Sequence, residues 1–458
     1  MENTINTLNG VTERAGYARL LSLGEESTVP DPDQSAAGDL LRHYAEQTKT
    51  IIREVLSNSN LSDSTLWKVA EECYKQATSP SGSLDPDVYM DQRAKSSSFA
   101  EDSSDAKRRQ AYRRCWVDFW IQAVNKSADG PTLFHLFYPP VSLGSEPLDF
   151  NPENVPTSLF RTCGRKSPGN SNAEIFSSIL STSGSQESRA DLLALEEEKV
   201  TTLPYHHLYN PSFTPAAKDN LMSWTSSPLF AIQCAIWKLH KGYESERRAS
   251  DINVCIVEPR NFPPGQFARD TWLLGSYRET AMHLGKDFQR FWELRDREEY
   301  YNGEYLSQGT LNHSNRSCLA SLDQLVEAGL YELYPELDDS EGKTKWTNRI
   351  KELRLFWSGK QTTKDDEIVC ALKLRSYLSP SSPLHMALML LAFKNCELKS
   401  EVPNLEKPPS WATRPVEVRR YWKTAEDLQS CGKASPSGNM SMNDNPLANY
   451  ESLRGMFA

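Results

Sequence analysis

Apolar side chains in the first quarter of the chain recur at spacings of three, four and seven residues, which is the pattern of amphipathic helices. The first such stripe lies over residues 40–56, and a second fits residues 61–76. A third helix is predicted over residues 106–123, which begin with basic residues and continue with aromatic ones. We therefore expect a helical region over residues 37–130, preceded by a polar, disordered tail over residues 1–36.

The pattern changes after Thr132 to short extended segments. Residues 252–259 (INVCIVEP) predict a strand, because β-branched residues cluster and a proline ends the run. Other strands are expected within residues 158–163, 220–227 and 303–311. Helices are expected over residues 173–198 and 228–240. Strands and helices that do not alternate regularly predict an α+β domain over residues 131–340.

The last quarter of the chain turns helical again. Apolar segments interrupted by charged residues predict a C-terminal helical region over residues 341–423. Residues 424–458 are rich in Ser, Asn and Gly and predict a second disordered tail. Residues 78–105 are rich in Ser, Asp and Pro, so we interpret them as a link between two of the N-terminal helices.

Composition narrows the classes of protein and partner. The 458 residues include 51 Lys and Arg and 61 Asp and Glu, a formal net charge of -10. This acidic balance gives the chain no overall positive field that would attract a polyanion, so we expect no nucleic-acid partner. The cluster between Lys107 and Arg114 is a candidate local patch for nuclear entry or polyanion binding. The solvated face of an amphipathic helix explains it better.

The chain carries no apolar run near the roughly 20 residues that a membrane helix needs. Its first 16 residues are polar and lack the features of a signal peptide. The nine cysteines are scattered, and no two are spaced as a CxxC pair, so we expect free thiols and no metal. These features predict an intracellular protein of the cytoplasm or nucleus without a membrane partner.

Common catalytic motifs are absent from the sequence: we find no GxGxxG, GxxxxGK[ST], GxSxG or HExxH. His206 and His207 adjoin proline and asparagine, which predicts a loop or a strand end. We interpret this pair as structural or surface residues rather than metal ligands.

Three segments together suggest chemistry on a nucleotide. Arg161 ends the run Leu-Phe-Arg, and its guanidinium suits a phosphate or a ribose. On a strand, Ser223, Thr225 and Ser227 would present hydroxyls on one face. Glu304 begins an apolar strand and could stabilise an oxocarbenium ion at an anomeric carbon. Arg, Ser/Thr and Glu in this order suit cleavage of an N-glycosidic bond.

Each of these residues also has a purely structural interpretation. Arg161 could pair with a surface carboxylate, and Glu304 could be a solvated charge at a strand edge. Ser226 or Ser227, directly before Pro228, is a good helix N-cap.

The order Arg161, Ser223–Ser227, Glu304 resembles the Arg–Ser/Thr/Ser–Glu pattern of ADP-ribosyltransferases. The wider pattern LFRTCG, SWTSSPLFAIQ and GEYLSQG over residues 155–336 also resembles an uncharacterised domain family of filamentous fungi. The first resemblance implies an α+β fold with a split mixed β-sheet, flanked by the two helical regions, and NAD as substrate without a metal. It implies that Arg161 holds the phosphate–ribose part of NAD.

The same resemblance implies that Ser223, Thr225 and Ser227 hold the nicotinamide riboside and that Glu304 is catalytic. Trp224 would stack on nicotinamide or belong to the core. Asn302 stands where the family often has Glu or Gln, at the position that helps to orient the accepting nucleophile in that family. A His-Tyr-Glu variant built on His207 and Tyr209 is a weaker alternative.

Two functions follow as hypotheses. The first is an ADP-ribosyltransferase or NAD glycohydrolase acting on an unknown acceptor, a protein or a small molecule. The second is a catalytically inactive binding or scaffold protein with the same fold. Convergence of Arg161, Ser223–Ser227 and Glu304 on one pocket favours the enzyme, whereas Arg161 and Glu304 on opposite faces of the sheet favour the binding protein.

Overall fold

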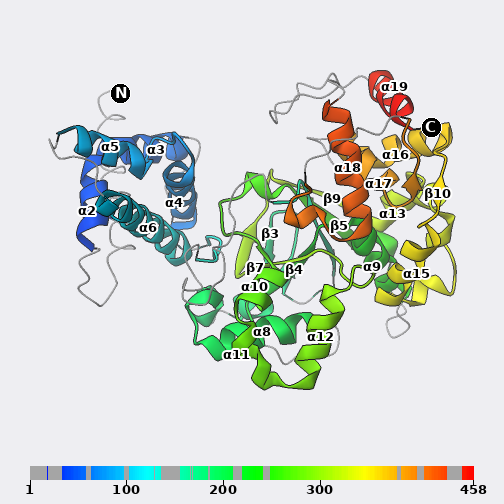
Figure 1. The fold of residues 1–458 in the computed structure, drawn as a ribbon, viewed down its shortest axis with the longest axis horizontal. Coiled ribbons are helices and arrows are strands. Elements are labelled where there is room, and N and C mark those ends of the chain that lie inside the picture. The colour runs from blue at the N-terminus through cyan, green and yellow to red at the C-terminus, as the bar shows by residue number, and fades with distance from the viewer. Residues whose placement is uncertain are drawn as a thin grey trace.

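The computed structural model describes residues 34–57, 63–96, 103–127, 129–135, 155–165, 169–183, 186–209, 219–240, 248–378, 383–399, 407–430 and 446–457, with the single residues Ala18 and Ser167 (Figure 1). Most of the predicted N-terminal tail therefore lies outside the described residues. Within the described part of the chain, no helix combines the length and the apolar character that a membrane crossing requires.

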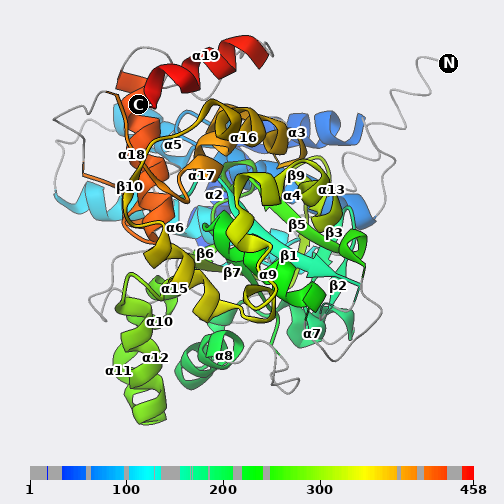
Figure 2. The ribbon, with the colours of Figure 1, turned by 90° about the vertical axis from the view of Figure 1, so that its right-hand side faces the viewer.

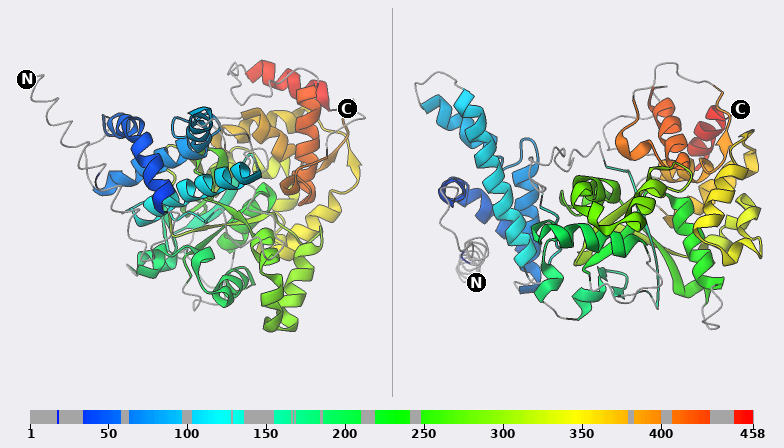
Figure 3. Two further views of the ribbon diagram at one scale, coloured as in Figure 1. Left: turned by 60° about the vertical axis from the view of Figure 1, so that its left-hand side comes forward. Right: turned by 60° about the horizontal axis from the view of Figure 1, so that its bottom comes forward.

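The predicted N-terminal helical region forms a unit with its own core, to one side of the rest (Figures 1 and 3). Its helices are α2 (Gln34–His43), α3 (Ala45–Ser57), α4 (Asp63–Thr78), α5 (Pro86–Ser96) and α6 (Ser103–Lys126). Trp116 and Trp120 of α6 are completely buried, so the aromatic residues of that helix face the core.

Helix α5 corrects the prediction that residues 78–105 are only a link. The Asp85 carboxylate accepts a hydrogen bond from the Asp87 amide at 3.0 Å, and Pro86 occupies the first helical position. Asp and Pro here begin a helix.

The α+β character of the middle region is confirmed. Among the described residues, six strands form one sheet in the order β6-β7-β4-β1-β5-β9. The strands are β1 (Leu159–Gly164), β4 (Leu221–Thr225), β5 (Ile252–Val257), β6 (Ala268–Arg269), β7 (Glu304–Gln308) and β9 (Ser317–Ser321).

The expectation of a mixed sheet is wrong, because every pair of neighbouring strands is antiparallel. Helix α9 (Pro228–His240) connects β4 to β5, which run in the same direction. Strand β1 lies between these two strands and runs opposite to both, so no parallel pair forms.

The helix predicted over residues 173–198 is not present in that form. Strands β2 (Asn170–Ser171), β3 (Ile175–Ser177) and β8 (Thr310–Asn312) form a smaller sheet instead. A short helix α7 (Ile179–Thr182) follows, and α8 begins only at Glu197 and ends at Tyr209. Ser178 and Asp191 each cap a short helical turn, so the polar side chains divide the segment into separate pieces.

Helix α9 packs against the sheet beside β1 and β5 (Figure 2). Its core continues into the C-terminal helices without a break. Those helices are α13 (Leu322–Glu327), α14 (Leu330–Leu333), α15 (Thr347–Phe356), α16 (Asp365–Leu378), α17 (Pro383–Leu391), α18 (Val416–Ser430) and α19 (Pro446–Met456), with a parallel pair β10 (Lys360–Gln361) and β11 (Asn395–Cys396). A separate cluster contains α8, α10 (Asp270–Ser276), α11 (Arg278–Ala281) and α12 (Lys286–Asp296).

Helix α19 corrects the prediction of an entirely disordered tail over residues 424–458. Leu453 and Phe457 are buried in the core of the C-terminal helices. Phe457 also forms a β-bridge with Leu398. Leu453 and Phe457 thus attach this otherwise polar segment to the core of the C-terminal helices.

Candidate functional site

A cavity of about 210 Å³ lies where β1, β4 and β7 meet α8 and α9. It is lined by five of the six residues that the sequence singled out: Arg161, Ser223, Trp224, Thr225 and Glu304. Ser227 does not line it. Residues from three strands, 143 positions apart in the chain, thus reach one cavity.

The register shows how these side chains reach the cavity. Thr225 pairs with Phe160 of β1 and with Glu304 of β7, so these three side chains share the face of the sheet that α9 covers. Successive side chains of a strand point to opposite faces, so Arg161, which follows Phe160, lies on the other face of the sheet. Strands β1 and β4 pair only at Phe160 and Thr225, and the cavity is lined by residues of both strands beyond that pair. Arg161 and Glu304 therefore line one cavity from opposite faces of the sheet.

The guanidinium of Arg161 has few partners. Its Nη1 donates to the Ser223 carbonyl oxygen at 2.8 Å, and the group lies 5.6 Å from the Phe176 ring and 5.9 Å from the Trp224 ring. Its Nε is buried without a hydrogen bond. Burial lowers the pKa of Arg161, and among the described residues no carboxylate forms a salt bridge with it. The predicted surface ion pair is thus not present.

The three hydroxyls of β4 and its C-terminal turn have different roles. Ser223 Oγ lies 2.9 Å from His207 Nε2, within the cavity. Thr225 donates to the Asn302 carbonyl oxygen and accepts from the Ser227 amide. Ser227 accepts from the Phe230 amide at 3.1 Å and donates to Glu417. Ser227 is therefore the N-cap of α9, and only Ser223 presents its hydroxyl to the cavity.

Trp224 belongs to the core. It is 1% exposed, its Nε1 donates to Ser307 Oγ at 2.8 Å, and its ring meets Phe176 and Phe267 edge to face. It contributes an apolar surface to the cavity, but its indole is held by these contacts.

Glu304 is part of a buried charge network. Its Oε2 accepts from Arg295 Nη1, which also donates to Asp270 at 2.5 Å. Asp270 accepts a further bond from Tyr301 at 2.8 Å. Burial raises the pKa of Asp270, whereas the net effect of the two carboxylates is to raise the pKa of Arg295 despite its burial. Arg295 therefore fixes one oxygen of Glu304.

Two residues of the cavity were not identified as a pair from the sequence. His207 Nδ1 lies 3.1 Å and 3.2 Å from the two oxygens of Asp219, and both residues line the cavity. His207 lies in the last turn of α8, which corrects the prediction of a loop or strand end. Tyr209, the other member of the alternative site, is 45% exposed and does not line the cavity. The sequence does contain a signal for this group, because His207, Asp219 and Ser223 all fall within one stretch of 17 residues.

An aromatic group also lines the cavity. Trp346 stacks on Phe230 and on Trp237, with ring centroids 5.3 Å and 5.1 Å apart. Lys238 of α9 lines it as well, and its Nζ donates to the Thr162 carbonyl oxygen at 3.3 Å. The cavity thus combines two cations, the two held carboxylates of Glu304 and Asp219, and flat apolar walls.

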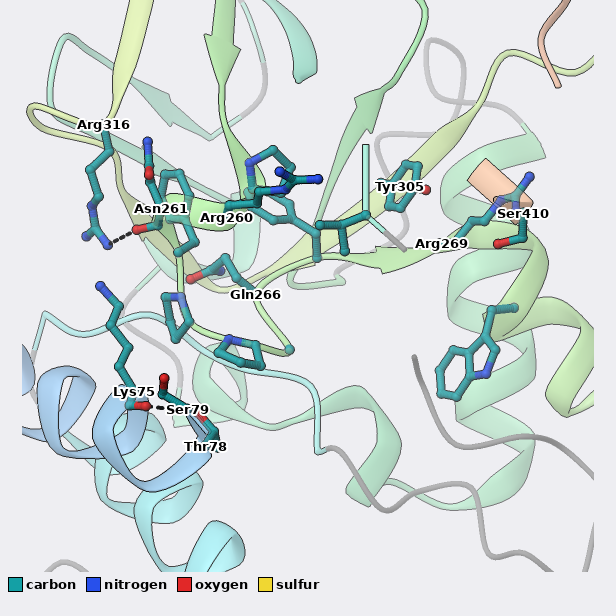
Figure 4. Close-up of a pocket in the computed structure, with 18 of the residues that line it drawn as sticks. Lys75, Thr78, Ser79, Arg260, Asn261, Gln266, Arg269, Tyr305, Arg316 and Ser410 are labelled. Atoms are coloured by element: carbon teal, nitrogen blue, oxygen red, sulfur yellow. Dashed lines mark hydrogen bonds between the residues drawn. The ribbon is translucent and has the colours of Figure 1, made fainter. Parts of the chain in front are cut away.

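A larger cavity of about 990 Å³ lies on the other side of β7, between the N-terminal helices and residues 259–272 (Figure 4). Lys75 and Arg316, which both line it, pair with the same buried carboxylate of Glu71 at 3.1 Å and 2.6 Å. These contacts join α4 to the sheet domain. Lys75 and Arg316 therefore already have a structural function.

Comparison of the chain with protein-family models, curated proteins and solved structures gives no match. Within the described ranges, no group of three or more His, Cys, Asp and Glu is arranged to hold a metal ion. The function must therefore be argued from the cavity itself.

Proposed function

We propose that the cavity at β1, β4 and β7 binds the nicotinamide-ribosyl part of NAD and that the protein cleaves the bond between nicotinamide and ribose. The observation that carries this proposal is Arg161, a partly buried cation whose Nε is buried without a hydrogen bond and which has no carboxylate partner among the described residues. A buried charge needs a partner, because desolvation without compensation is costly. A bound phosphate would supply that partner.

The size of the cavity limits what enters it. A volume of about 210 Å³ is below the roughly 300–1,000 Å³ of pockets for drug-sized ligands. It suits the nicotinamide ring and its ribose with the adjoining phosphate at Arg161, and the adenosine part of the dinucleotide would lie outside. The stacked rings of Phe230, Trp346 and Trp237 offer a flat surface for a base.

Glu304 would supply the negative charge that the reaction needs. As the C1′–N bond breaks, nicotinamide leaves as a neutral base and the ribose acquires oxocarbenium character, which a fixed carboxylate stabilises. Water or an acceptor hydroxyl then adds to C1′ and releases a proton. Asn302 does not line the cavity, and its carbonyl oxygen accepts from Thr225. This arrangement favours water over a macromolecular acceptor.

A second candidate is binding of the nucleotide without cleavage. Arg161 and Glu304 approach the cavity from opposite faces of the sheet, and Arg295 neutralises part of the Glu304 charge. Both features weaken the electrostatic stabilisation of an oxocarbenium ion while leaving a binding site intact.

The test is release of nicotinamide from NAD by the full chain, with calorimetric binding of NAD in parallel. Glu304→Gln should lower the rate roughly 100-fold or more. Arg161→Met should weaken NAD binding about 10- to 100-fold, since a hydrogen bond to a charged group contributes about 1.5–3 kcal/mol. The exposed Arg165 and Glu327 provide the matched controls Arg165→Met and Glu327→Gln, which should change neither quantity.

Binding by the wild type without nicotinamide release would select the second candidate. Absence of binding, or an Arg161→Met variant with wild-type affinity, would reject both.

A further inference from the structure

Ser223, His207 and Asp219 form a continuous hydrogen-bonded chain within the cavity. Ser223 Oγ lies 2.9 Å from His207 Nε2, and His207 Nδ1 lies 3.1 Å from Asp219 Oδ1. Asp219 is 5% exposed and the His207 side chain 18% exposed. The proposed NAD reaction uses neither His207 nor Asp219. Their arrangement therefore calls for a separate explanation.

The elements that carry this chain hold it in place. His207 lies on α8, Asp219 lies two residues before the start of β4, and Ser223 is the central residue of β4. The Asp219 carboxylate also accepts the Leu221 amide at 2.9 Å, which fixes its orientation. A carboxylate only accepts, so His207 Nδ1 carries the proton and Nε2 is the acceptor that faces the Ser223 hydroxyl.

We propose that Ser223 is the nucleophile of an acyl-transfer site, with His207 as its general base and Asp219 as the residue that positions His207. Hydroxyl, imidazole and carboxylate in this order are the arrangement that activates a serine. The substrate class is an ester with a small acyl group, because the cavity is about 210 Å³ and is lined by Leu221, Met222 and Ala231.

The reaction balances with water as the only co-reactant. Ser223 Oγ attacks the carbonyl carbon of the ester, and its proton passes to His207 Nε2. The bond to the alcohol oxygen breaks, and the alcohol leaves with that proton. Water then attacks the acyl-serine, gives a proton to His207, and the acid is released as the proton returns to Ser223. Arg161 and Lys238, which line the same cavity, supply positive charge for the oxyanion.

The experiment uses the full chain, p-nitrophenyl acetate and a fluorophosphonate probe that labels activated serines. The wild type should hydrolyse the ester and carry one covalent label on the peptide containing Ser223. Ser223→Ala should lose both. His207→Gln and Asp219→Asn should lower kcat by about 10²- to 10⁴-fold with little change in KM. Ser226→Ala is the matched control, because Ser226 is three residues away, does not line the cavity and makes no hydrogen bond through its Oγ.

Asp219 does not touch the substrate. Its role must therefore be tested by a measurement that a loss of stability alone would not change. Asp219→Asn should alter the pH dependence of kcat while the thermal unfolding midpoint stays within a few degrees of the wild type. Labelling of Ser223→Ala equal to that of the wild type, or an unlabelled wild type that unfolds cooperatively, would overturn the proposal.

This inference does not rest on the proposed NAD function, and separate measurements can reject either proposal without the other. Nicotinamide release is measured on the same preparations. Ester hydrolysis that needs Ser223 and His207, without nicotinamide release, rejects NAD cleavage alone. Nicotinamide release without labelling of Ser223 rejects the acyl-transfer site alone.

Discussion

Arg354 and Glu417 form a buried, two-pronged ion pair at the first turn of α9. Arg354 Nε and Nη2 donate to the two oxygens of Glu417 at 3.0 Å and 2.8 Å, and the side chains are 4% and 1% exposed. Glu417 also accepts from Ser227, and Arg354 Nη1 donates to the Tyr301 carbonyl oxygen at 3.0 Å. This pair connects the C-terminal helices to the N-cap of α9 and to the segment that precedes β7, the strand that carries Glu304.

Breaking that pair should destabilise the whole domain. Glu417→Gln leaves the Arg354 charge buried without a counter-ion, and we expect a loss of about 3–5 kcal/mol of unfolding free energy. Urea denaturation followed by circular dichroism measures it. The pair Arg419–Glu298 is the control, since its side chains are 46% and 42% exposed and Arg419→Ala should cost less than about 1 kcal/mol. Equal shifts in the two variants would contradict the prediction.

The stability of the protein should fall in mild acid through His313. Its Nδ1 faces Ser317 Oγ at 2.6 Å, its Nε2 faces the Asn172 carbonyl oxygen at 3.2 Å, and its ring stacks on Phe176. Burial lowers the pKa of His313 from 6.5 to about 4. The folded state thus favours the neutral imidazole of His313. The stability that this group contributes is fully present above pH 6.5.

As the pH falls from 6.5 to 4, the unfolded chain binds a proton that the folded protein does not, and stability decreases by at most about 3 kcal/mol. Chemical denaturation between pH 4 and 8 should show this slope, and His313→Gln should flatten it. An unchanged slope in the variant would assign the acid sensitivity to other groups.

Gly303, the residue before Glu304, should not tolerate a side chain. Its φ is +64°, and an added Cβ would lie 2.1 Å from Ser226 Oγ. We expect Gly303→Ala to cost about 1–2 kcal/mol for the left-handed backbone alone, with a further loss from the clash. Adding Ser226→Ala should restore most of the second part, since only the contact with Pro415 Cδ at 3.0 Å and that with the Cβ of residue 226 at 3.3 Å remain, and none of the first. A double variant no more stable than Gly303→Ala, measured by thermal unfolding, would show that the backbone strain is the whole effect.

Arg295 should be needed for both stability and the position of Glu304. Arg295→Met leaves Asp270 and Glu304 without their shared cation, and we expect a loss of about 3–5 kcal/mol. Asp270→Asn in the same chain should recover part of it, because one uncompensated charge is removed. A double-mutant cycle measures the coupling. Arg297→Met, two residues away and exposed, is the control; additive effects of Arg295→Met and Asp270→Asn would rule out the coupling.

Much of the fold was predictable from the sequence, because the patterns that indicate a helix or a strand lie within each short segment. Short apolar segments, with clustered β-branched residues in β5, identified β1, β4, β5, β7 and α9, because most residues of these elements are buried. The helical nature of both flanking regions followed from the same pattern. The sequence could not place α19, because only the tertiary contact of Leu453 and Phe457 makes that polar segment helical.

For the candidate site, too, some features could be predicted from the sequence and others depend on the tertiary structure. The sequence by itself selected Arg161, Ser223, Thr225 and Glu304 by residue type and strand context, and these residues line one cavity. Only the tertiary structure decided what each hydroxyl does, since Ser227 became a cap and Thr225 a backbone contact through partners 190 and 77 residues away. It also brought His207 and Asp219 to Ser223, because the end of α8 packs beside β4. A strand pattern specifies which face a side chain takes, whereas its hydrogen-bond partners depend on how separate elements pack.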